Sequence, residues 1–241
     1  MSDLIQLFQK LRSDVDSLLT SETAISGWQK HGYTWVYVSA TQFKIIGVDV
    51  TAHFPVGMKI RLKQGAGYLY FYVVSAAFGS DTTVTVTGGS DYNLANANIT
   101  DNYYSYAAEV QGFPQWFNYA ATVSGTGGTA GSYAESTNIQ RFQVVGRSCN
   151  VVIEKQITNL GSWSGTVQVL APITPNLANY ERSPSGFIYA FAAAANSPKG
   201  CMPSFNTTNG FYFDKTIGAT NVQWSDMATN DFIFINYLYK I

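Results

Sequence analysis

The last eleven residues of the chain, Asp231 to Ile241, read DFIFINYLYKI. Successive side chains of an extended strand point to opposite faces of its sheet. The two faces of this strand therefore carry Phe232, Phe234, Asn236, Leu238 and Lys240 on one side and Ile233, Ile235, Tyr237, Tyr239 and Ile241 on the other. An antiparallel strand with one face in water alternates apolar and polar residues, whereas this strand is largely apolar on both faces. We therefore expect both faces to be covered, and we favour another copy of the chain over an earlier segment as the second cover.

The composition narrows the classes of partner. Charged residues make up 12% of the 241 residues, against about 25% in typical soluble domains, and aromatic residues make up 15%. A net charge of −1 argues against binding to nucleic acid, because contact with a phosphate backbone requires a basic face. Few charges combined with many aromatic residues indicate that much of the surface lies in a permanent interface.

No segment of the sequence indicates secretion or membrane insertion. The N-terminus MSDLIQLFQK lacks the basic start and apolar run of a signal peptide. The longest apolar stretch, Tyr68 to Phe78, is interrupted by Ser75 and is too short to span a bilayer. We interpret the two cysteines, Cys149 and Cys201, as buried reduced thiols, with a disulfide between them as the alternative.

Residues 1–26 are predicted to form an amphipathic helix that Ser2 caps and Gly27 ends. Its apolar residues recur every four and three positions, as in a heptad repeat. The helix either lies on its own domain or joins other copies in a short trimeric coiled coil. We favour the coiled coil because an isolated helix of this length is only marginally stable. The predicted trimer interface consists of Leu4, Phe8, Leu11, Val15, Leu18, Phe234, Tyr237 and Tyr239.

Residues 27–119 are predicted to form a small β module. Alternating residues predict strands around Tyr33–Val38 and Met58–Lys63, and turns rich in glycine connect the latter to strands Tyr68–Ala77 and Thr82–Thr87. Tight turns between consecutive strands indicate a meander, here within a small barrel. A short helix is expected around Leu94–Ile99.

The second half of the chain is predicted to be a separate β domain. Residues 120–132 are rich in Gly, Ser and Thr and are interpreted as a flexible linker. Residues 133–241 contain eight strand candidates separated by turn signals, which indicates a β-sandwich of the jelly-roll type. These candidates lie near Gln140–Val145, Val151–Ile157, Trp163–Leu170, Phe187–Ala195, Cys201–Phe205, Phe211–Lys215, Thr220–Trp224 and Phe232–Ile241. The fold class expected for the whole chain is mainly β.

Several motifs resemble known families. The segments Gly27-Trp28, Thr34–Tyr37, Gly57–Gln64, Tyr70–Val73, Gly88–Ala95 and Gly112–Pro114 resemble, in order and spacing, a small β module recurrent in bacteriophage structural proteins. The C-terminal half, through Phe142–Gly146, Val151–Ile157 and the final strand, is similar to the jelly-roll heads of trimeric phage fibres and of the tumour-necrosis-factor and C1q type. The second resemblance implies that the last strand is central in a sheet that meets a threefold axis.

The sequence shows no constellation typical of an enzyme. His31 and His53 are the only histidines, so one chain cannot supply a metal site with several imidazoles beyond these two. We expect both to be surface or turn residues, and we expect no catalytic residue, metal or cofactor. A carboxylate pair such as Glu181 with Asp226 leaves open a polysaccharide-degrading activity. Aromatic residues near predicted turns are candidate glycan contacts, with a core or interface position as the alternative: Trp163, Tyr180, Tyr212 and Trp224.

These observations predict a non-enzymatic virion protein of a tailed phage that assembles as a homotrimer. The helix would form a stalk or anchor, the small module a neck, and the jelly roll an exposed head that contacts a host surface glycan or protein. The alternative is a trimeric capsid decoration protein with the same architecture. The expected partners are copies of the chain itself, other virion proteins of the tail, baseplate or capsid, and a host glycan, with no nucleic acid and no membrane.

Overall fold

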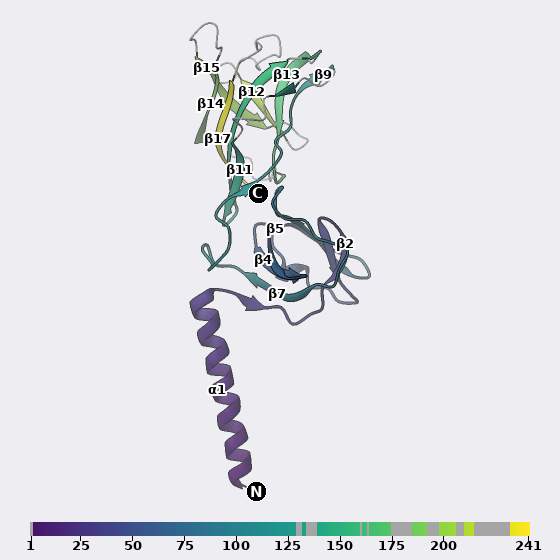
Figure 1. The fold of residues 1–241 in the computed structure, drawn as a ribbon, viewed down its shortest axis with the longest axis vertical. Coiled ribbons are helices and arrows are strands. Elements are labelled where there is room, and N and C mark those ends of the chain that lie inside the picture. The colour runs from purple at the N-terminus through teal and green to yellow at the C-terminus, as the bar shows by residue number, and fades with distance from the viewer. Residues whose placement is uncertain are drawn as a thin grey trace. The chain divides into compact units, whose positions relative to one another are not determined.

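A computed structural model of the chain describes residues 2–128, 132–133, 139–159, 161–162, 164–174, 185–191, 198–205, 210–214 and 232–241. The chain divides into two compact units (Figure 1). The first unit comprises Met1–Val86 and Asn93–Pro114, and the second comprises Thr87–Tyr92 and Gln115–Ile241. One helix precedes strands in both units, so the prediction of a mainly β chain with an N-terminal helix is confirmed.

Helix α1 (Ser2–Ser26) forms where the heptad spacing predicts it. It ends at Gly27, whose φ of 72° is a left-handed conformation that glycine adopts without strain. A Cβ atom at this position would also lie 3.2 Å from Cγ2 of Val110, so the close packing beside the turn favours glycine. The backbone N–H of Trp28 donates to Oγ of Ser26 at 3.2 Å and fixes the exit from the helix.

The first unit contains a seven-stranded sheet with the order β1-β7-β4-β5-β6-β3-β2. Its elements are β1 (Gln29–Lys30), β2 (Val36–Ser39), β3 (Gln42–Ile45), the 3-10 helix η1 (Thr51–His53), β4 (Lys59–Gln64), β5 (Gly67–Phe78), β6 (Thr82–Thr87) and β7 (Thr100–Ser105). The neighbours β4, β5 and β6 follow one another in sequence, which confirms the predicted meander. Strands β1 and β2 are the two ends of the sheet, so hydrogen bonds do not close it into a barrel.

Aromatic and branched side chains fill the core of the first unit. Trp35 stacks on Phe43 with ring centroids 4.3 Å apart, and the edge of Phe54 packs against both rings. Alternation on β4 directs Ile60 and Leu62 to this core, where both are fully buried.

The structure corrects two predictions in this unit. Residues 94–99 form no helix, because the N–H of Leu94 donates to the carbonyl of Ala40 at 2.9 Å and the Leu94 side chain is buried. His31, expected to be a surface or turn residue, lies in the loop after β1 but is only 5% exposed, because aromatic rings surround it. His53 is exposed at the end of η1, as expected.

The second unit contains a ten-stranded sheet with the order β8-β11-β12-β17-β14-β15-β16-β13-β9, and β10 pairs with β12 beside this path. Its strands are β8 (Phe117–Asn118), β9 (Val123–Gly127), β10 (Ser132–Tyr133), β11 (Gln140–Val145), β12 (Ser148–Asn159), β13 (Ser164–Leu170), β14 (Ser185–Phe191), β15 (Pro198–Phe205), β16 (Gly210–Asp214) and β17 (Phe232–Lys240). Seven of the strand candidates correspond to β11–β17. The remaining one, Thr220–Trp224, lies outside the described residues.

The prediction of a flexible linker over residues 120–132 is wrong for residues 123–127 and for Ser132, which belong to strands. Strand β9 pairs with β13 in antiparallel register, and the Ser132 end of the segment belongs to β10. A Cβ atom on Gly125 would lie 2.4 Å from the carbonyl oxygen of Ser164. The glycine here therefore permits a close approach of two backbones, which is a common reason for glycine within a strand.

Strand β17 lies between β12 and β14, so both of its edges are paired and it is central in the sheet (Figure 1). Tyr237, Tyr239 and Ile241 are buried within their own chain. On the opposite face Asn236 and Lys240 are exposed and Leu238 is 43% exposed. The expectation that another copy covers this strand is thus corrected for the face of Tyr237 and Tyr239, which an earlier part of the same chain covers.

Candidate functional site

Helix α1 carries an exposed apolar stripe. Its seven side chains are each between 44% and 70% exposed: Leu4, Ile5, Leu7, Phe8, Leu11, Val15 and Leu18. A helix that packs on its own domain buries such a stripe. The predicted interface residues of the helix thus present their apolar side chains to the surroundings, and no segment in the described part of the chain covers them.

The predicted interface residues of strand β17 have different surroundings. Tyr237 and Tyr239 stack with ring centroids 5.6 Å apart, and Oη of Tyr239 donates to the carbonyl of Ile173 at 2.8 Å. Both rings are at most 4% exposed, so neither offers a surface to another subunit. Phe234 is partly exposed and is the one predicted interface residue of this strand that remains accessible.

Most of the predicted glycan contacts, and both members of the carboxylate pair, are not among the described residues. Trp163, Tyr180, Trp224, Glu181 and Asp226 are outside the described residues. Tyr212 belongs to β16, with its backbone opposite Gln168 and Ser204 on the neighbouring strands. The glycan contacts and the carboxylate pair therefore stay predictions.

His31 is held as a neutral ring inside an aromatic cluster. Its Nδ1 accepts a hydrogen bond from Nε1 of Trp35 at 3.1 Å and lies 3.4 Å from the N–H donor of Tyr33. Burial, together with the neighbouring His53, lowers the pKa of His31 from 6.5 to about 4. His31 and His53 lie 6.0 Å apart, but in the described part of the chain no three metal-ligating side chains gather, so the pair is not a metal centre of the usual kind.

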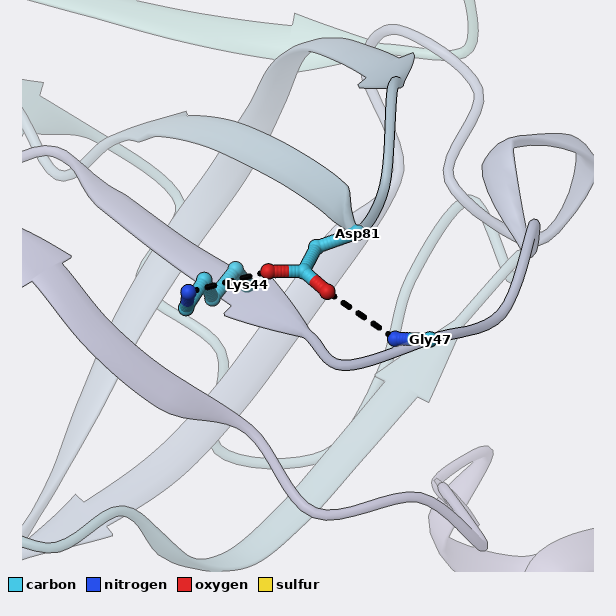
Figure 2. A network of polar contacts seen from close by, with 3 residues as sticks. All are labelled: Lys44, Gly47 and Asp81. Carbon is cyan, nitrogen blue, oxygen red and sulfur yellow. Dashed lines mark hydrogen bonds and ion pairs between the residues drawn. The ribbon is translucent and has the colours of Figure 1, made fainter.

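An ion pair lines an open hollow of about 450 Å³ at the β5–β6 turn. Asp81 accepts from Nζ of Lys44 at 2.9 Å and from the backbone N–H of Gly47 at 3.0 Å (Figure 2). These two contacts lower the pKa of the Asp81 carboxyl. Because the carboxylate and the ammonium group bind each other, the network is a clamp between the turn and the loop after β3, with neither charge left for a ligand.

The second unit buries weakly acidic groups, a thiol and two tyrosine hydroxyls. The free thiol of Cys149 is fully buried, and burial raises its pKa to about 12. Burial also raises the pKa of Tyr239 and of Tyr119, whose hydroxyl is buried without a hydrogen-bond partner. A thiol nucleophile requires a lowered pKa, whereas Cys149 is a free and buried thiol, as expected from the sequence.

The outer face of strand β4 carries the arrangement that sequence reasoning missed. Arg61 lies opposite Tyr103 on β7 and Tyr70 on β5, and its guanidinium contacts several aromatic faces. The signal was present as cations at alternate positions of one strand and tyrosines at alternate positions of the next. This alternation by itself predicts a half-buried strand and does not indicate which strand lies beside it.

Comparison with known proteins adds no relative. No protein-family model, no curated protein and no solved structure matches the chain. Within the described residues, no helix combines the length and the apolarity needed to cross a membrane.

Proposed function

We propose that the chain is a non-enzymatic structural protein of a tailed-phage virion that assembles as a homotrimer and acts as a short attachment fibre. The observation that carries the proposal is the uncovered apolar stripe of α1. The resemblance of the small β module to phage structural proteins supports the virion location, and the low charge and high aromatic content support a permanently assembled state.

Association of the helices has a clear physical reason. Full burial of a Val, Leu, Ile or Phe side chain stabilises by about 1.5–3 kcal/mol, and seven such side chains of each helix are exposed in the single chain. An isolated helix of this length is marginal in water, so partner helices also stabilise the helix itself. Three copies would present each binding surface three times, which raises avidity without new contacts.

Sedimentation equilibrium of the full chain tests the assembly, and we expect three chains per particle. Leu11→Glu places a charge on the stripe and should give monomers, because a buried unpaired carboxylate is costly. Gln6→Glu is the matched control, since position 6 lies on the opposite side of the helix and is exposed. A wild-type chain that sediments as a monomer, or trimers that survive Leu11→Glu, would overturn the proposal.

The location on the particle distinguishes attachment from capsid decoration, which the same trimer would also serve. Cryo-electron microscopy of virions with an epitope inserted at the exposed Gly65–Gly67 turn should label the tail or baseplate. Labelling spread over the capsid would assign the chain to decoration instead.

A further inference from the structure

Three aromatic rings surround the guanidinium of Arg61 on the outer face of β4. Its Cζ lies 4.8 Å from the ring centroid of Trp28, 4.8 Å from that of Tyr68 and 4.4 Å from that of Tyr103. We call these four residues the Arg61 box. The rings come from three separate segments of the first unit, because Trp28 follows the helix, Tyr68 is on β5 and Tyr103 is on β7.

Among the described residues, no acceptor receives a hydrogen bond from Arg61. The ion pairs found in the described part of the chain are Lys10–Asp14 and Lys44–Asp81, and neither involves this arginine. Its Nε is buried without a hydrogen-bond partner, while the residue as a whole is partly exposed. Tyr68, at the rim of the box, is 38% exposed. The rings therefore enclose the guanidinium on several sides, and no carboxylate in the described part of the chain neutralises its charge.

Lys59, two residues earlier on the same face of β4, shows how the chain treats a cation with a structural role. Its Nζ donates to the carbonyls of Ala107 at 3.0 Å and Ala108 at 2.8 Å, and the residue is buried. The lysine is thereby satisfied and ties the loop after β7 to the sheet. Arg61 faces the same way, but ring faces take the place of such acceptors, so no hydrogen bond within the described residues occupies its donors.

The chemistry of the Arg61 box fits an anionic ligand with a flat apolar side. Arginine presents its N–H donors in a planar fork that matches the two oxygens of a carboxylate. Lys63 follows on the same face of β4 and is partly exposed, which adds a second positive charge next to the fork. Tyrosine at the rim offers an aromatic face together with a hydroxyl that hydrogen-bonds polar groups.

We propose that the Arg61 box binds the carboxylate of an acidic surface polysaccharide. The choice of a polysaccharide rests on the proposed attachment function, whereas the choice of a carboxylate rests on the geometry of the box. Arg61 would contact the carboxylate, Lys63 would add charge, and the exposed ring of Tyr68 would pack against the sugar ring.

Isothermal titration of the full-length protein with trigalacturonate tests the site, with maltotriose as the neutral trisaccharide of the same length. We expect trigalacturonate to bind at least tenfold more tightly than maltotriose. Arg61→Gln should weaken trigalacturonate binding at least tenfold, as the loss of charged hydrogen bonds predicts. Arg61→Lys keeps the charge without the fork and should give an intermediate affinity. Arg141→Gln is the matched control, because that arginine is exposed and lies over the single ring of Trp116 at 4.7 Å.

Each other outcome overturns the proposal in a defined way. Equal affinity for the two sugars, or an unchanged affinity in folded Arg61→Gln, excludes Arg61 as the anion contact. An equal loss in Arg141→Gln shows nonspecific attraction, and equally tight binding of tri-glutamate removes the assignment to a sugar. Thermal unfolding of each variant shows whether it folds. If Arg61→Gln does not fold, Arg61→Lys and Lys63→Gln take its place, and an unchanged affinity in both overturns the site. Sedimentation of the same samples separates the two proposals: trimers that do not bind overturn only the site, and monomers that bind overturn only the assembly.

Discussion

The two units bury polar groups of opposite proton chemistry. The first unit encloses His31, a base whose pKa is lowered to about 4. The second encloses the thiol of Cys149 and the hydroxyl of Tyr239, two acids whose pKa values are raised. In each case burial disfavours the charged form, so the folded unit keeps the group neutral. Through these groups, low pH should destabilise the first unit and high pH should destabilise the second.

The buried polar groups have different partners in the two cores. In the first unit the imidazole serves as one more ring among Trp35, Phe54 and Tyr104, and its Nδ1 gives the Trp35 N–H an acceptor. In the second unit the Tyr239 hydroxyl donates a hydrogen bond to the carbonyl of Ile173, which satisfies both groups. The Trp35 N–H and the Ile173 carbonyl are thus satisfied, as buried polar groups generally are, whereas Nε2 of His31 and the Tyr119 hydroxyl are buried without a partner among the described residues.

The largest expected effect tests whether the two cores are separate. Tyr237→Ala removes a ring that is 1% exposed from the second unit and should cost about 3–5 kcal/mol of its unfolding free energy. The neighbouring Leu238 is 43% exposed, so Leu238→Ala should change stability by less than about 1 kcal/mol. Urea unfolding, followed by hydrogen exchange of amides in each unit, measures both.

Two outcomes would contradict these expectations. If Tyr237→Ala weakened exchange protection equally in the first unit, the two units would unfold together. If Leu238→Ala were as costly as Tyr237→Ala, another subunit would have to cover the exposed face of β17.

The next effect is acid destabilisation of the first unit through His31. The folded pKa of about 4 lies below the unfolded value of 6.5, so the unfolded chain binds the proton first as the pH falls. The stabilisation is complete above pH 6.5 and is lost as the pH falls towards 4, by about 3 kcal/mol in total. His31→Asn keeps an acceptor near Nδ1 and removes the titration, so its stability should be flatter over this window. Urea midpoints at pH 7, 6, 5 and 4.5 measure the slope, and an equal slope in both proteins would exclude His31 as its source.

A smaller effect over the accessible range is alkaline destabilisation of the second unit. The folded pKa of Cys149, about 12, lies above the usual value of 9.0. The unfolded chain therefore loses its proton first, and stability should fall by up to about 1.4 kcal/mol between pH 9 and pH 10. Tyr239 acts in the same direction, whereas Lys155, whose pKa burial lowers, acts in the opposite one. Cys149→Ala should reduce the slope, and stability that rises with pH in the wild type would reverse the comparison of the units.

The sequence allowed most of the fold to be predicted where local signals agree with tertiary packing. The heptad spacing and Gly27 predicted the limits of α1, alternation predicted β4 and β6, and an apolar run between turn signals predicted β5. The signals failed where a distant backbone decides the conformation. Gly125 looked like a flexible linker residue because composition does not reveal the carbonyl of Ser164 that packs against it.

The candidate site could be predicted only in part, for a related reason. The apolar stripe of α1 follows from sequence spacing alone, and its side chains are exposed in the single chain, while the coiled coil stays a prediction. The pattern of β17 indicated that its faces need cover without indicating which segment covers them. The Arg61 box depends on register, because the pairing of Arg61 with Tyr103 joins strands whose order in the sheet is not sequential.

The smallest expected effect compares one turn carboxylate of each unit. Asp81 binds both Lys44 and the N–H of Gly47, whereas Asp91 binds the backbone N–H of Asn118 at 2.8 Å and its side-chain amide at 2.9 Å. Asp81→Asn retains an acceptor for Gly47 and loses the ion pair, so it should lower the melting temperature only slightly. Salt screens a partly exposed ion pair, so 1 M NaCl should shrink the difference between Asp81→Asn and the wild type. The corresponding difference for Asp91→Asn should resist salt, because Asp91 binds amide groups in place of a cation. Equal salt sensitivity of the two variants would show that the Lys44 contact contributes nothing specific, and the clamp at Asp81 would then rest on the Gly47 hydrogen bond alone.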